Sequence, residues 1–172
     1  MSVYQCMLAD ISDVTAFLPK AVLIGILVGI VLRLCHVRGR QWTGSVLFVI
    51  YAVVLLQTVF FCREPGSRWG TDMRLFGTWG TTMQDHAWVL ENVLLFIPFG
   101  LLLPLLLPKR WHPITVPAGL FGSICIEFVQ LRTGRGFCQL DDIVMNTLGA
   151  LAGYILWLAG RGLLRGILRF CD

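Results

Sequence analysis

Apolar residues along the chain fall into five long runs separated by polar segments, the longest of which follows the second run. The runs cover residues 16–34, 43–62, 91–107, 114–131 and 143–160. A helix needs about 20 apolar residues to cross the hydrocarbon core of a bilayer, and each run is close to that length. The pattern therefore predicts an all-α fold, a polytopic membrane helix bundle with about five transmembrane helices.

The composition supports this interpretation. Of the 172 residues, 56% are hydrophobic and 14% are charged, and the mean hydropathy is +0.75. A soluble domain of this size would need more charge to cover its surface. We therefore interpret residues 1–172 as a single membrane domain, and we expect the net charge of +4 to set the topology rather than to bind nucleic acid.

Cations are distributed unevenly between the two ends of the predicted bundle. One end carries a single acid, Asp172, and eight cations: Arg33, Arg38, Arg40, Lys109, Arg110, Arg161, Arg165 and Arg169. The other end carries nearly all the acids and six cations: Lys20, Arg63, Arg68, Arg74, Arg132 and Arg135. Cytoplasmic loops of membrane proteins are enriched in Lys and Arg. We therefore expect the N-terminus outside the cell and the C-terminus in the cytoplasm.

Polar side chains gather at the outer ends of three of the predicted helices. They are Asn92 at the start of the third run, Glu127 and Gln130 near the end of the fourth, and Asp141, Asp142 and Asn146 at the start of the fifth. Ionisable groups in membrane helices are costly and usually mark function. The pattern predicts a polar site beneath the loop of residues 63–87, with Glu127 as its sharpest candidate. The alternative is a structural ion pair between Glu127 and Arg132 or Arg135.

The fifth run carries a polar face that continues as glycine. Asp142, Asn146, Gly149 and Gly153 are spaced i, i+4, i+7 and i+11, which places them on one face of a helix. Small residues on a membrane helix let a neighbouring helix approach closely. We therefore expect another helix to pack against Gly149 and Gly153.

Three motifs occur in a fixed order over residues 63–154. They read Asn92-x-x-x-Phe96-x-Pro98-x-Gly100, Glu127-x-x-Gln130, and Gly134-Arg135 leading to Asp142-x-x-x-Asn146-x-x-Gly149. Together they resemble the core of the VanZ family of small bacterial membrane proteins, and REPGSR at 63–68 resembles the arginine-containing loop of many relatives. Many relatives carry an acid where this chain has Gln139, so no charge-dependent role is expected there. The resemblance implies a bacterial cytoplasmic membrane protein linked to glycopeptide resistance of the teicoplanin type.

Several kinds of chemistry are poorly supported by the sequence. It contains no glycine-rich phosphate loop, nucleotide fingerprint or Ser-x-x-Lys motif, and its Cys and His residues lack zinc spacing, so we expect no cofactor and no metal. The hydroxyl groups of Thr133 and Thr147 have no adjacent base for a catalytic triad. Topology allows a disulfide between Cys62 and Cys138, but we expect free thiols.

Two classes of function remain open. In the first, the site binds an amphiphile without chemistry: a membrane lipid, a lipid-linked wall precursor or a glycopeptide antibiotic. Arg132 and Arg135 would hold anionic groups, and the polar side chains of the site (Asn92, Gln130, Asp141 and Asn146) would orient the ligand. In the second, the protein is an intramembrane enzyme acting on a lipid headgroup, with Glu127 or Asp142 as general base. Whether it is an enzyme, and its oligomeric state, are left open by the sequence.

Overall fold

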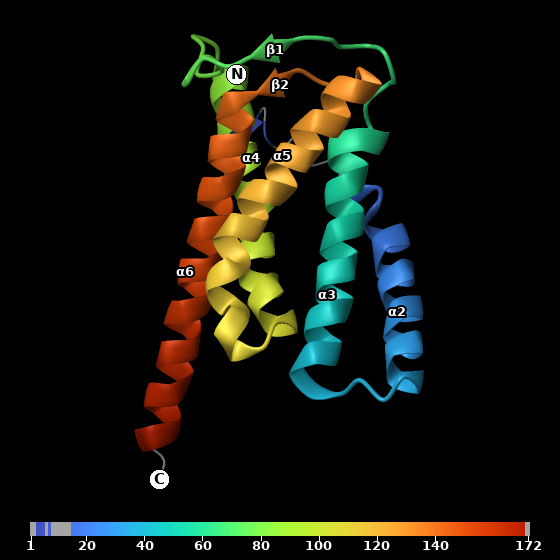
Figure 1. Cartoon of the computed structure of the whole chain (residues 1–172), viewed down its shortest axis with the longest axis vertical. Helices are drawn as coiled ribbons and strands as arrows, with labels where there is room; N and C mark the ends of the chain where they lie inside the picture. The colour runs from blue at the N-terminus through green and yellow to red at the C-terminus, as the bar shows by residue number, and fades with distance from the viewer. Residues whose placement is uncertain (1–2, 6, 8–14, 171–172) are drawn as a thin grey trace.

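The computed structural model describes residues 3–5, 7 and 15–170, and the side chains up to residue 163. Helices dominate it (Figure 1). They are α2 (Leu18–Leu34), α3 (Gly39–Leu56) with its π-helical continuation η1 (Gln57–Phe61), α4 (Met83–Leu106), the 3-10 helix η2 (Lys109–Ile114), α5 (Thr115–Thr133) and α6 (Leu140–Phe170). Two short strands complete the fold, β1 (Thr71–Asp72) and β2 (Cys138–Gln139).

Within the described part of the chain, four helical segments are long and apolar enough to cross a membrane: Gly39–Phe61, Met83–Leu106, Lys109–Thr133 and Leu140–Leu163. This confirms the predicted all-α, multi-pass membrane fold. The first of the five expected spans is present as α2, which packs along α3. Its 17 residues extend about 26 Å at 1.5 Å per residue, somewhat less than a bilayer core of about 30 Å.

The helix α4 begins earlier than the hydrophobic pattern predicts. It starts at Met83 rather than at residue 91. The hydroxyl of Thr82 accepts a hydrogen bond from the backbone N–H of Asp85 at 3.1 Å, and the Asp85 carboxylate accepts one from the Thr82 N–H at 3.0 Å. This reciprocal capping box satisfies two backbone donors at the helix start. The loop between η1 and α4 is therefore shorter than predicted. It covers residues 62–82, and we call it the crossing loop.

Close packing of α4 against α6 forms the centre of the bundle. A Cβ atom at Gly149 would collide with the backbone oxygen of Val93, and one at Gly153 would collide with that of Ile97. Gly100 of α4 lies equally close to the backbone of α6. The expectation that a neighbouring helix packs against Gly149 and Gly153 is confirmed, and the neighbour is α4.

The crossing loop lies over one end of the bundle, where α4 and α6 begin and α5 ends (Figure 1). Its strand β1 pairs in parallel with β2, so that Thr71 lies opposite Cys138 and Asp72 opposite Gln139. We call this the strand end of the molecule. The opposite end, with the turn between α2 and α3 and the helix η2, is the turn end. The pairing ties together segments far apart in the chain and closes the strand end from above.

Candidate functional site

A cavity of about 790 Å³ lies beneath the crossing loop, within the range of about 300–1,000 Å³ that is usual for ligand pockets. Its charged lining residues are Arg63, Arg68, Asp85, Glu91 and Asp142, and its neutral polar ones include Thr58, Asn92 and Gln139. Apolar side chains form the rest of the wall, among them Val59, Trp88, Leu94, Leu95 and Phe137. The cavity therefore combines charges of both signs with an apolar surface.

Asn92 and Asp142 form the acidic side of the cavity. The Asn92 side-chain nitrogen donates a hydrogen bond to Oδ1 of Asp142 at 2.6 Å. Asn92 lies on α4 and Asp142 in the first turn of α6. The close packing of these two helices at Gly149 and Gly153 keeps the two side chains next to each other. Both residues were predicted from the sequence, and both line the cavity.

Arg63 supplies a cation to the same cavity. It follows the end of α3 and η1, and its side chain is partly buried. Burial lowers the pKa of Arg63, whereas the charges of Asp142 and Glu127 act in the opposite direction. A guanidinium nevertheless stays protonated in proteins. The cavity thus holds a fixed positive charge that faces carboxylates on α5 and α6.

Glu127 lies beside this cavity rather than in its lining. The side chain is 2% exposed, and Oε2 accepts a hydrogen bond from the backbone N–H of Gln139 at 3.0 Å. Burial raises the pKa of the Cys138 thiol, and the charges of Glu127 and Asp142 raise it further. The described residues contain no direct ion pair of Glu127 with Arg132 or Arg135. The carboxylate therefore holds β2 in place. Its negative charge also acts on the Arg63 guanidinium in the cavity.

Gln130 and Arg135 support the backbone next to Arg63. The Gln130 side-chain nitrogen donates to the carbonyl oxygen of Val59 at 3.0 Å, and Arg135 Nη1 donates to that of Phe60 at 2.6 Å. Both carbonyls belong to the π-helix η1, and an unsatisfied carbonyl is costly at membrane depth. These two residues lie outside the cavity lining, and they fix the segment from which Arg63 extends.

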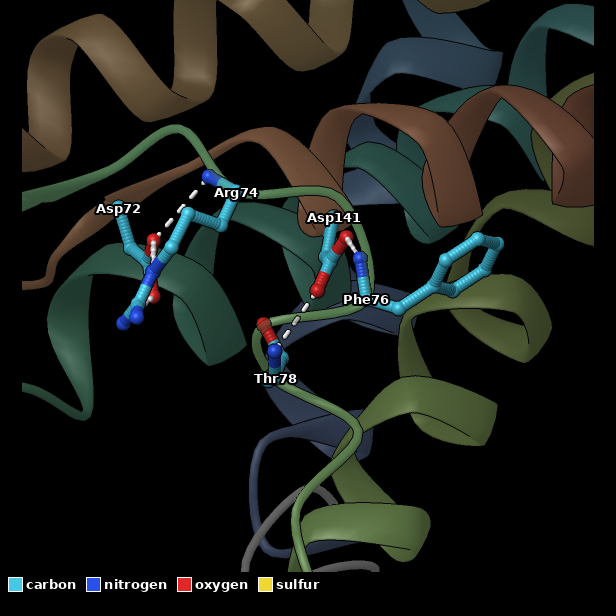
Figure 2. A network of polar contacts seen from close by, with 5 residues as sticks. All are labelled: Asp72, Arg74, Phe76, Thr78 and Asp141. Carbon is cyan, nitrogen blue, oxygen red and sulfur yellow. Dashed lines mark hydrogen bonds and ion pairs between the residues drawn. The ribbon is translucent and has the colours of Figure 1, made fainter.

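Asp141 holds the crossing loop in place. Its carboxylate oxygens accept hydrogen bonds from the backbone N–H groups of Phe76 at 2.5 Å and Thr78 at 2.7 Å (Figure 2). The side chain is 2% exposed. Thr78 lines the cavity, so Asp141 connects the cavity roof to the start of α6. Asp72 and Arg74, which precede Phe76 in the same loop, form an ion pair at its surface (Figure 2).

The remaining predicted site residues lie away from the cavity. Asn146 is buried inside the bundle, where its side-chain nitrogen donates to the Ser123 hydroxyl at 2.9 Å and connects α6 to α5. Arg132 is exposed on the last turn of α5. Cys62 and Cys138 are free thiols, as expected. The described residues hold no group of three His, Cys, Asp or Glu side chains placed to bind a metal ion.

Arg63 and Arg68 line the cavity but are not among the site residues predicted from the sequence. Their signal was available in the segment REPGSR, which follows directly after the second apolar run and therefore begins at the level of the other polar groups. What the pattern could not show is the fold of the crossing loop, which turns both arginines toward the cavity.

A sequence model of one protein family, described as VanZ/LLP1, matches residues 48–165. This range contains the three motifs and nearly all of the cavity wall, from Thr58 of η1 to Asp142 of α6. Neither the curated proteins nor the solved structures contain a match to the chain. The match covers well over half of the chain, and the protein therefore belongs to the VanZ/LLP1 family.

Proposed function

We propose that the protein binds the headgroup of an amphiphilic envelope component in the cavity at the strand end. The observation that carries the proposal is the composition of the cavity wall. Arg63 and Asp142 place opposite charges at its polar side, while Leu94 and Leu95 line it on the adjacent stretch of a spanning helix. Leu94 is 50% exposed, so an apolar chain leaving the cavity can continue along the surface of α4 into lipid.

The mixed charge of the wall favours a headgroup that itself carries both charges. An anionic group would pair with Arg63 and Arg68, for which a guanidinium offers charge-assisted, bidentate hydrogen bonds. A cationic or amide group would pair with the Asp142 carboxylate, whose Oδ1 is already oriented by Asn92. Peptide headgroups have this chemistry. A lipid-linked wall precursor and a glycopeptide with a lipid-like tail both combine such a headgroup with an apolar chain.

An outward-facing cavity in the bacterial cytoplasmic membrane fits this proposal. Six cations of the turn end have described side chains, and no acid lies among them: Arg33, Arg38, Arg40, Lys109, Arg110 and Arg161. Because cytoplasmic ends are enriched in Lys and Arg, the turn end would face the cytoplasm and the strand end the outer leaflet. Wall precursors and glycopeptide antibiotics are both encountered there, which supports a role in teicoplanin-type resistance.

A second candidate function is intramembrane catalysis on the same headgroup. The observation that favours it is the position of Asp142, whose carboxylate lines the cavity and could accept a proton from a bound ligand. Glu127, the other candidate base, is hydrogen-bonded to the backbone outside the cavity lining. Incubation of the purified protein with teicoplanin or with a lipid-linked wall precursor separates the two functions, since only an enzyme changes the mass of the ligand.

The proposed binding is tested with Arg63→Gln and Asp142→Asn, which remove a charge and nearly keep the shape of the polar side chain. We expect both variants to fold at wild-type yield, measured by fluorescence-detected size exclusion, and to lose teicoplanin resistance in a host that lacks the protein. Arg74→Gln is the matched control, because Arg74 is exposed on the crossing loop and outside the cavity lining. Full resistance in both cavity variants would refute the proposed site.

A further inference from the structure

Three cations from separate segments meet at the turn end of the molecule. They are Arg40 at the start of α3, Lys109 in η2 and Arg161 on α6. Arg40 Nη2 donates a hydrogen bond to the carbonyl oxygen of Leu107 at 3.3 Å. Arg161 Nη1 lies 3.4 Å from Nδ1 of His112, and the charges of all three cations act on the His112 ring. We call Arg40, Lys109 and Arg161 the basic cluster.

The buried His112 ring fixes one member of the cluster. The ring is 3% exposed, and its Nε2 lies 3.1 Å from the Leu107 carbonyl oxygen, which can only accept a hydrogen bond. Nε2 therefore carries the hydrogen, and Nδ1 of the neutral ring accepts from Arg161. The Arg161 guanidinium also lies over the Trp157 ring, 5.1 Å from its centroid. Held on two sides, Arg161 presents its remaining N–H donors in a defined direction.

The basic cluster has no counter-charge among the residues that the structure describes. Every described acid lies in the crossing loop or in the strand-end half of its helix: Glu64, Asp72, Asp85, Glu91, Glu127, Asp141 and Asp142. Like charges that are gathered in one place repel one another. A bound anion would remove this repulsion, so the arrangement points to a ligand rather than to an internal ion pair.

The apolar surroundings indicate what kind of anion this is. Trp111 and Ile114 are 48% and 43% exposed beside Lys109, at the end of a spanning segment. Such a surface suits acyl chains, whereas a soluble anion would gain nothing from it. We propose that the basic cluster binds the phosphate of an anionic phospholipid, with the acyl chains against this surface. The site lies at the opposite end from the headgroup cavity and does not rest on the function proposed for that cavity.

The wild-type protein tests the lipid class directly. Native mass spectrometry of the detergent-purified protein would compare phosphatidylglycerol with phosphatidylcholine of the same acyl chains. We expect binding of phosphatidylglycerol to be at least about tenfold tighter, because both lipids carry the same phosphodiester but the choline ammonium of phosphatidylcholine adds a positive charge that the basic cluster repels. Equal binding of the two lipids would overturn the proposal. Displacement of phosphatidylglycerol by an equimolar amount of inorganic phosphate would also overturn it, in favour of a site for a soluble anion.

Variants of single arginines locate the site. Arg40→Gln and Arg161→Gln should each weaken phosphatidylglycerol binding by about tenfold. Arg38→Gln is the matched control, since Arg38 is an exposed arginine at the same end of the molecule, two residues from Arg40, and is not among the charges that act on His112. An equal loss in all three variants would show general attraction to the basic end and refute a site. If Arg161→Gln lowers the folded yield, the comparison of Arg40→Gln with Arg38→Gln decides alone, because the exposed Arg40 side chain has a single weak backbone contact.

Discussion

At the scale of single residues, the polar groups of the strand end divide into those that line the cavity and those that hold the backbone around it. Asn92 and Asp142 meet in the cavity, as their positions in the predicted helices suggested. Gln130, Asp141 and Arg135 instead satisfy backbone groups of segments more than sixty residues away in the chain. The sequence pattern around a polar residue at a helix end is the same in both cases, because the tertiary fold decides which group that residue contacts.

The electrostatic effect of Glu127 can be measured on a neighbouring thiol. Burial raises the pKa of Cys138, and the negative charge of Glu127 adds to this effect. Because the thiolate is the reactive form, Glu127→Gln should lower the pKa and shift the midpoint of Cys138 alkylation to lower pH. Iodoacetamide labelling across a pH series, read by mass spectrometry, gives the midpoint. Arg74→Gln should leave it in place, and an unchanged or higher midpoint in Glu127→Gln would contradict the assignment.

The anchoring role of Asp141 predicts a loss of stability. An asparagine at this position keeps one acceptor oxygen but turns an N–H donor toward a second backbone donor. Asp141→Asn should lower the free energy of unfolding by about 1.5–3 kcal/mol, the contribution of a hydrogen bond to a charged group. Thermal melting in detergent measures this effect, and limited proteolysis should show faster cleavage within the crossing loop. Wild-type values in both measurements would argue that the loop is held by other contacts.

At the scale of elements, the long apolar runs predicted the spanning helices well because lipid imposes a minimum length on them. The start of α4 was missed because the capping box of Thr82 and Asp85 lies in a polar segment, where hydropathy carries no signal. The pairing of β1 with β2 could not be predicted either. Each strand has two residues, and nothing local shows that Thr71 lies opposite Cys138.

The glycine contact between α4 and α6 predicts unequal tolerance of two neighbouring substitutions. Gly149→Leu would push a side chain into the backbone of Val93, whereas Leu151 is 38% exposed and away from this contact. Overpacking forces helices apart and costs about 1–3 kcal/mol or more. Gly149→Leu should therefore reduce the folded yield by size exclusion, while Leu151→Ala retains it. Equal yields would mean that the two helices can separate without cost.

At the scale of the whole molecule, the distribution of charge predicts the orientation in the membrane. Cys62 is exposed at the strand end and Cys35 at the turn end. In single-cysteine variants on intact cells, a membrane-impermeant thiol reagent should label Cys62 at once and Cys35 only after permeabilisation. The reverse pattern would place the cavity in the cytoplasm and would exclude encounter with an external antibiotic.

The central claim is that the cavity beneath the crossing loop binds an amphiphile through Arg63. Its most direct test is the dissociation constant of teicoplanin and of a lipid-linked wall precursor for the purified protein in nanodiscs. At least one of them should bind the wild type and the Arg74→Gln control equally. Its affinity for Arg63→Gln should be weaker by about tenfold or more, because a buried charge-assisted contact is lost. Binding to Arg63→Gln as tight as to the wild type, or binding of neither ligand, would contradict the account.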